Sequence, residues 1–215
     1  MTIEELEQQL ARAEELLKAM DGYTLLNVRL QGFEDVSQAQ RELAAAKGEE
    51  YATPYDIGVT PEAAVSGPVV LQTDYNVILT FNAMKEKPDG YREDAGTAIV
   101  EFKRCIITKF GYPNDEARWG HPLGDKGLGA YGVYEIMNST WIRQLTDFNR
   151  IRFPNTPDSD QRHFMFTFHD STFECIADGM EVRVSDEPYE QIFAYMSKRT
   201  VWRDADIQWD GEESQ

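Results

Sequence analysis

Residues 163–184, HFMFTFHDSTFECIADGMEVRV, contain the clearest strand pattern of the chain. Side chains two residues apart lie on the same face of a strand, and three phenylalanines share one face: Phe164, Phe166 and Phe168. Proteins that combine sheets with helices usually bury one sheet face under helices. We therefore expect this face to be core, covered by the helices that carry Trp141 and Phe193.

The dipeptide Asp178-Gly179 within this stretch is typical of a two-residue hairpin turn. A hairpin folded there would place Glu174 opposite Arg183, with an apolar face behind this charged pair. The stretch thus predicts antiparallel strands joined by a tight turn.

Four further segments are rich in β-branched and aromatic residues and predict strands: residues 69–71, 77–81, 97–107 and 131–136. A regular alternation of strands and helices, which would favour a parallel sheet, is absent. The pattern predicts an α+β fold, mainly an antiparallel β-sheet (a meander) with helices packed on one face and a helical N-terminal segment.

The N-terminal segment begins with a capping box, Thr2 and Glu5. Apolar residues then recur at spacings of three and four and predict one helix ending near Asp21-Gly22: Ile3, Leu6, Leu10, Ala13, Leu17 and Met20. This apolar seam must pack on its own domain or on a second copy. A second helix is expected over residues 36–47, so we divide the chain into a helical segment (1–50) and an α+β domain (51–215).

Three other short elements are expected to be helical. A turn of helix is predicted at Thr60-Pro61. A helix capped by Asn138 or Ser139 should follow, and its apolar stripe contains Trp141. The last helix should open at residues 185–188, with these residues on its core face: Tyr189, Ile192, Phe193 and Met196.

Charge and composition exclude several classes of partner. The 215 residues include 21 Lys and Arg against 38 Asp and Glu, a formal net charge of −17. Nucleic acid and anionic membrane surfaces would be repelled by this average field. No apolar stretch reaches the ~18 residues of a membrane span. Cys105 and Cys175 form no CxxC pair, and the N-terminus lacks a signal-peptide pattern, so we expect a soluble, cytoplasmic protein with reduced thiols.

The candidate catalytic residues lie in the run His169-Asp170-Ser171-Thr172-Phe173-Glu174. His169, Asp170 and Glu174 could bind a metal or form a base with an orienting carboxylate. The alternative is a structural turn in which Asp170 bonds nearby backbone and Glu174 pairs with Arg183.

A long irregular segment, residues 111–129, supplies candidate ligand-binding residues: Tyr112, Arg118, Trp119 and His121. Loops of this length inside compact domains are often functional, and aromatic, guanidinium and imidazole groups suit ligand contact. The alternative is an ordered surface loop in which Trp119 plugs the edge of the core.

Two functional hypotheses follow. The first is a non-catalytic binding or assembly module without a cofactor, which meets a protein, a small ligand or a second copy, the last through the N-terminal helix. The second is a small-molecule enzyme, assisted by a divalent metal on His121 and His169, with Glu174 as ligand or base. The enzyme hypothesis requires the 111–129 loop to bend back over the turn at residues 169–174.

Overall fold

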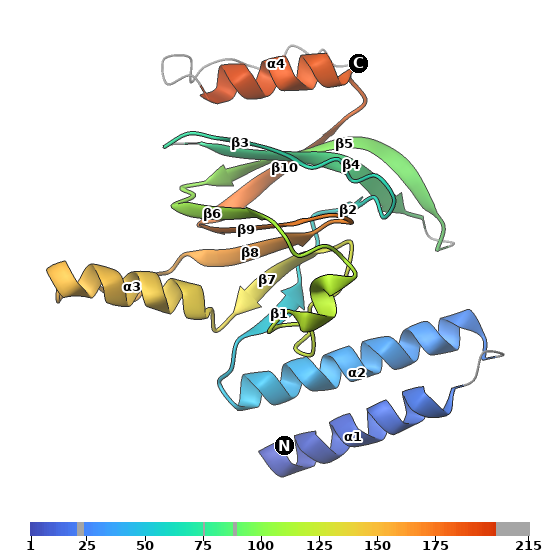
Figure 1. Ribbon diagram of the computed structural model, residues 1–215. Helices are drawn as coiled ribbons and strands as arrows, with labels where there is room; N and C mark the ends of the chain where they lie inside the picture. The colour runs from blue at the N-terminus through green and yellow to red at the C-terminus, as the bar shows by residue number, and fades with distance from the viewer. Residues whose placement is uncertain (21–23, 75, 88–89, 201–215) are drawn as a thin grey trace.

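The computed structural model describes residues 1–20, 24–74, 76–87 and 90–200. Two five-stranded antiparallel sheets pack face to face, and the α-helices lie outside this sandwich (Figure 1). The predicted α+β class with antiparallel sheets is confirmed. The strands, however, are divided between two sheets rather than forming one.

Sheet A has the order β1-β7-β8-β9-β6, with these bounds: β1 (Tyr51–Pro54), β7 (Val133–Met137), β8 (Arg162–Thr167), β9 (Thr172–Ala177) and β6 (Ile107–Gly111). In sheet B, β10 pairs with β5, β5 with β4, and both β2 and β3 with β4: β10 (Gly179–Ser185), β5 (Arg92–Lys103), β4 (Val77–Glu86), β2 (Thr60–Pro61) and β3 (Val69–Gln72). The predicted single strand at 97–107 is therefore two strands in different sheets. The predicted helical turn at Thr60-Pro61 is the short strand β2.

The core lies between the two sheets and is built from aromatic rings. Phe164, Phe166 and Phe168 are fully buried there, as expected of the alternating face. Their cover differs from the prediction, because Phe81 and Phe102 of sheet B pack against them in place of a helix. Two inward faces of opposing sheets bury each other, so the helices are left to cover outer faces.

The hairpin predicted at Asp178-Gly179 is wrong. The chain reverses at this point, but β9 belongs to sheet A and β10 belongs to sheet B. Arg183 lies opposite Ile99 of β5, whereas Glu174 lies opposite Met165 on one side and Lys109 on the other. Both edges of β9 are already paired, with β8 and β6, so β10 has no edge there to join.

Helices α1 (Ile3–Ala19) and α2 (Leu26–Ala46) form an antiparallel hairpin below sheet A (Figure 1). The predicted capping box is present, because the Thr2 and Glu5 side chains each bond the other's backbone N–H. Helix α2 starts ten residues earlier than predicted. The predicted α1 end at Asp21-Gly22 lies outside the described residues. The hairpin meets the body through the carboxyl-terminal half of α2, where Ala39 and Ala44 are buried.

Helices α3 (Thr140–Arg152) and α4 (Tyr189–Thr200) lie on opposite sides of the sandwich (Figure 1). Ser139 caps α3, as one of the two predicted caps. Ile192, Tyr195 and Met196 of α4 pack on sheet B, whereas Tyr189 and Phe193, predicted to be core, are half exposed. None of the helices in the described ranges is long and apolar enough to cross a membrane.

Candidate functional site

The irregular segment 111–129 does bend back over the turn that follows β8. The Asp115 backbone N–H donates a hydrogen bond of 2.9 Å to the His169 carbonyl oxygen. The approach that the enzyme hypothesis required is therefore confirmed. A short 3-10 helix, η1 (Ala117–Gly120), gives part of this segment regular structure.

The first group of functional side chains is the His169 cluster, which comprises Asp115, Tyr131 and His169. Asp115 Oδ2 lies 3.0 Å from His169 Nδ1 and accepts a hydrogen bond from the Tyr131 hydroxyl. This bond from Tyr131, together with the His169 interaction, holds the pKa of Asp115 below its ordinary value. The same bond raises the pKa of Tyr131. A half-exposed imidazole oriented by a carboxylate can accept or donate a proton at its outer nitrogen.

The predicted site residues are divided between two places. Asp170 points to solvent, with its carboxylate 4.0 Å from His169 Nε2. Glu174 is bonded to His163 and not to His169, and it does not pair with Arg183. Sequence reasoning therefore identified individual residues of two clusters but not their partners.

The described residues contain no ligand set for the divalent metal of the enzyme hypothesis. Within the ranges that the structure describes, no three His, Cys, Asp or Glu side chains lie close enough to hold a metal ion. His121 accepts a hydrogen bond of 3.2 Å from the Leu123 N–H at Nδ1. Burial lowers the pKa of His121, although the negative charge of Glu174 acts to raise it. This imidazole therefore tends to be neutral. Metal binding by His121 and His169 stays a prediction.

The other predicted ligand-binding residues differ in accessibility. Tyr112 and Trp119 are 81% and 71% exposed, so Trp119 does not plug the core. Arg118 is buried, donates to the Leu128 carbonyl oxygen at 2.5 Å, and lies 4.3 Å from the Trp119 ring centre. Arg118 thus supports the loop, and the two aromatic rings are the groups available for contact.

Residues 127–132, GLGAYG, have the GxGxxG spacing of dinucleotide-binding loops. That motif requires a strand before it and a helix after it. Here β7 follows, and the glycines serve packing instead. A side chain at Gly129 or Gly132 would collide with the Tyr134 hydroxyl, and one at Gly127 with the Ala52 carbonyl oxygen.

The second group is a buried pair of consecutive hydrogen bonds that link the side chains of Ser139, His163 and Glu174, which we call the Ser139 chain. Ser139 Oγ lies 2.9 Å from His163 Nδ1, and Glu174 Oε2 lies 3.0 Å from His163 Nε2. The His163 side chain is only 4% exposed. Ser139 precedes α3, His163 lies on β8 and Glu174 lies on β9, so three elements position these three side chains.

A cation and an indole ring complete this network. Lys109 Nζ lies 3.8 Å from Glu174 Oε2 and 3.7 Å from the centre of the Trp141 ring. The Trp141 ring also meets the His163 ring edge to face at 5.2 Å. Burial tends to raise the pKa of Glu174, but the His163 hydrogen bond and the Lys109 charge outweigh it and lower the pKa. Glu174 is therefore a carboxylate at neutral pH.

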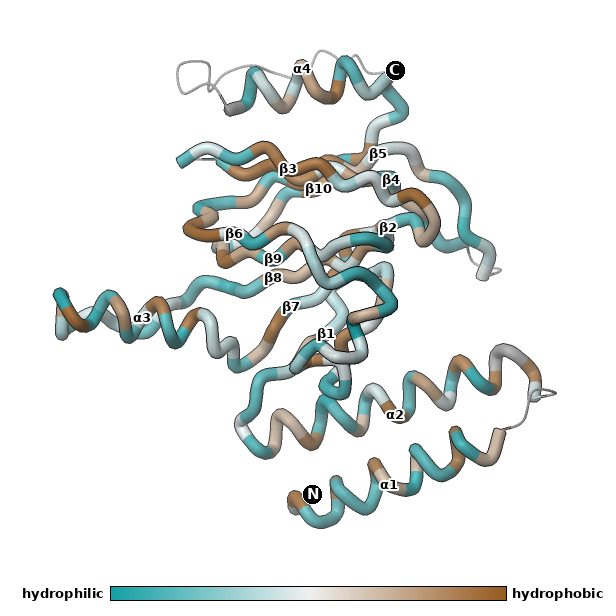
Figure 2. Tube along the Cα trace, viewed as in Figure 1, coloured by the Kyte–Doolittle hydropathy of each residue, from teal (hydrophilic) through white to brown (hydrophobic). Residues whose placement is uncertain are grey.

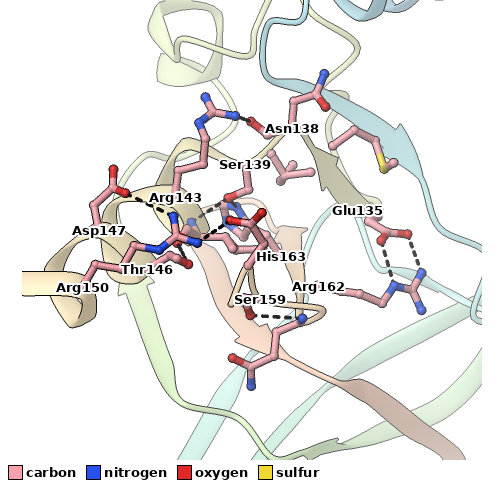
Figure 3. A pocket seen from close by; sticks show the side chains of 15 residues that line it. Glu135, Asn138, Ser139, Arg143, Thr146, Asp147, Arg150, Ser159, Arg162 and His163 are labelled. Atoms are coloured by element: carbon pink, nitrogen blue, oxygen red, sulfur yellow. Dashed lines mark hydrogen bonds and ion pairs between the residues drawn. The ribbon is translucent and has the colours of Figure 1, made fainter. Parts of the chain in front are cut away.

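A pocket of about 480 Å³ opens beside the Ser139 chain, between α3 and the strands β7 and β8 (Figure 3). Ser139 and His163 both line it. Two of its arginines are paired with carboxylates of the pocket: Arg162 forms a bidentate bond with Glu135, and Arg150 bonds Asp158 at 2.9 Å. A third arginine of the wall, Arg143, donates to the Asn138 carbonyl oxygen.

Glu174→Gln tests the charge state of this network. The folded-state pKa of Glu174 is lowered, so ionised Glu174 stabilises the fold above its unfolded pKa, and this stabilisation is lost as pH falls through the folded pKa. We expect the variant to be less stable at neutral pH by about 1–3 kcal/mol. In urea denaturation the difference from wild type should shrink below about pH 4.5. An unchanged difference between neutral and acidic pH would show that the charge is not responsible.

Comparisons with protein-family models, with curated proteins and with solved structures find no match for this chain.

Proposed function

We propose that the chain is an assembly module whose copies join head to tail, with the end of α3 of one copy bound to the α1–α2 hairpin of the next. One observation carries this proposal. Both α3 and the hairpin extend beyond the sandwich (Figures 1 and 2). Each carries exposed apolar side chains on the same side as the residues that are buried closer to the sandwich.

Helix α3 packs at its amino-terminal end and is exposed at the other. Trp141 in the first turn is buried against His163. Phe148 lies two turns further on the same side of the helix, seven residues after Trp141. Phe148 and Ile151, which we call the α3 patch, are 71% and 82% exposed.

Helix α2 packs against the body at its carboxyl-terminal end and is exposed toward its amino-terminal end. Ala44 is buried near the body, and Arg41 lies against Gly127. Leu30 and Phe33 continue the same side of α2 at spacings of three and four residues through Ser37. These two residues, which we call the hairpin patch, are 55% and 49% exposed.

Charge favours contact between the two patches rather than between like patches. Helices α1 and α2 contain eight acidic and four basic side chains, whereas α3 contains three arginines and one aspartate. Exposed Glu34 adjoins the hairpin patch, and exposed Arg152 adjoins the α3 patch. Complementary charge orients association and disfavours the like-with-like pairing, so a second copy of this chain supplies a suitable partner.

The two patches occupy different parts of the molecule, so their pairing is heterologous. Such an interface joins the α3 patch of one copy to the hairpin patch of the next. The first copy then still has a free hairpin patch, and the second still has a free α3 patch. It therefore continues until a ring closes or a filament forms.

Sedimentation velocity of two single variants and of their mixture tests the head-to-tail arrangement. We expect wild type to form species that grow with concentration and weaken with salt, because screening reduces the charge attraction. Ile151→Asp and Leu30→Asp should each sediment as a monomer. An equimolar mixture should form a dimer and nothing larger, since one intact α3 patch then meets one intact hairpin patch.

Val65→Asp is the matched control, because Val65 is also exposed and apolar but lies outside both patches. It should assemble like wild type. A monomeric wild type at high micromolar concentration would refute the proposal. A mixture of the two monomeric variants that fails to dimerise would refute the head-to-tail arrangement.

A further inference from the structure

The Ser139 chain lies outside the two patches and has the order of groups that nucleophilic catalysis requires. A carboxylate cannot donate a hydrogen bond, so the proton between His163 and Glu174 belongs to His163 Nε2. In the neutral imidazole Nδ1 is then an acceptor, and it lies 2.9 Å from Ser139 Oγ. The serine hydroxyl therefore faces a base whose ring is held from behind by a carboxylate.

The backbone around Ser139 also suits a nucleophile. The chain passes from β7 through a single left-handed residue, Asn138 (φ 53°), to Ser139 and the first turn of α3. A tight strand-to-helix turn projects a side chain from the end of the sheet. The helix amino terminus adds partial positive charge beside the Ser139 oxygen, which accepts the Ile142 N–H at 3.2 Å.

Glu50 accepts a hydrogen bond from the backbone N–H that a nucleophilic Ser139 would need, the N–H of Thr140. The backbone N–H that follows a nucleophile commonly stabilises the oxyanion of the reaction intermediate. Here the Thr140 N–H donates to Glu50 Oε1 at 2.6 Å, and the Thr140 hydroxyl donates to the same oxygen at 3.0 Å. The negatively charged Glu50 oxygen thus already accepts this hydrogen bond, and it prevents the oxyanion of an intermediate from accepting it.

We propose that Ser139, His163 and Glu174 hydrolyse small carboxylic esters, and that Glu50 blocks the oxyanion donor in the conformation described. The pocket volume suits a small molecule. Among the arginines of its wall, Arg162 and Arg150 are paired with carboxylates of the pocket, and Arg143 donates to the Asn138 carbonyl oxygen.

The reaction balances without a cofactor. Ser139 Oγ forms a bond to the ester carbonyl carbon as its proton passes to His163 Nδ1, and the bond to the alcohol oxygen breaks as His163 returns the proton to that oxygen. Water then attacks the acyl-serine while His163 takes one of its protons. The acid leaves, and the proton returns to Ser139.

Diisopropyl fluorophosphate tests the nucleophile directly, because Ser139 Oγ would bond to phosphorus as fluoride leaves. Peptide mass spectrometry of wild type should locate the adduct on Ser139. Glu50→Ala should raise the labelling rate and the hydrolysis of 4-nitrophenyl acetate about tenfold by freeing the Thr140 N–H. His163→Ala should lower both by about 10²-fold or more.

Ser159→Ala is the matched control, since Ser159 also lines the pocket but has no histidine partner, and both rates should be unchanged. If His163→Ala fails to fold in a thermal melt, Glu174→Gln replaces it, with a reduction of about tenfold expected. The proposal is overturned if neither wild type nor Glu50→Ala carries an adduct on Ser139. It is also overturned if a folded Ser139→Ala hydrolyses the ester at the wild-type rate.

Discussion

Phe166→Ala is expected to lower the free energy of unfolding by about 3–5 kcal/mol. The Phe166 ring is fully buried between the sheets and contacts the rings of Phe81, Phe102 and Phe173. Its removal leaves a cavity that neither sheet can close without breaking strand pairs on the other side. Urea denaturation followed by tryptophan fluorescence measures the loss.

Phe193→Ala controls for the loss of an aromatic ring as such. Phe193 is half exposed on α4 and belongs to no inter-sheet contact. We expect a change below about 1.5 kcal/mol. If both variants lost the same stability, the aromatic layer between the sheets would not be the main source of stability.

Gly127→Ala is expected to have the second largest effect, a loss of about 3 kcal/mol or more. Gly127 has φ +91°, which strains any other residue. A methyl group there would also collide with the Ala52 carbonyl oxygen and come within 2.6 Å of Arg41 Cγ. The glycine therefore allows α2, β1 and the 121–132 segment to meet at one point.

Gly58→Ala separates strain from collision. Gly58 also has a positive φ of +81°, but a methyl group there would meet no atom within 4 Å. We expect this control to lose only about 1–2 kcal/mol, the cost of the left-handed backbone. Equal losses for the two variants would mean that contact at Gly127 is unimportant. Limited proteolysis should in addition release the hairpin faster from Gly127→Ala than from Gly58→Ala.

The features that could be predicted from the sequence depend on near neighbours in the chain. The capping box at Thr2, the cap at Ser139 and the alternation of Phe164 with Phe166 each involve residues within a few positions of one another. Local hydrogen bonds and side-chain periodicity determine such features, so composition and spacing are sufficient.

The partners of these elements could not be predicted in the same way. The turn at Asp178 was recognised, but which sheet received β10 depended on β9 having both edges paired. No sequence pattern links His163 with Ser139, which is predicted as a possible cap of a helix. Their approach depends on strand register: His163 is opposite Ile176, so Glu174 lies diagonally across from it, two residues along β9. Only a correct pairing of β8 with β9 would have revealed this.

The passage of the chain between the sheets has a consequence for folding kinetics. Sheet A begins with Tyr51 but cannot pair it until Met137 is available, and sheet B pairs Lys103 with Gly179. Hairpins between neighbouring strands, β3 with β4, β4 with β5 and β8 with β9, can form within short segments. Loop-closure entropy must be overcome before the long-range pairs β1 with β7 and β5 with β10 contribute. We expect the amides of these hairpins to gain exchange protection early in refolding and those of the two long-range pairs to gain it later, which pulsed amide exchange would measure.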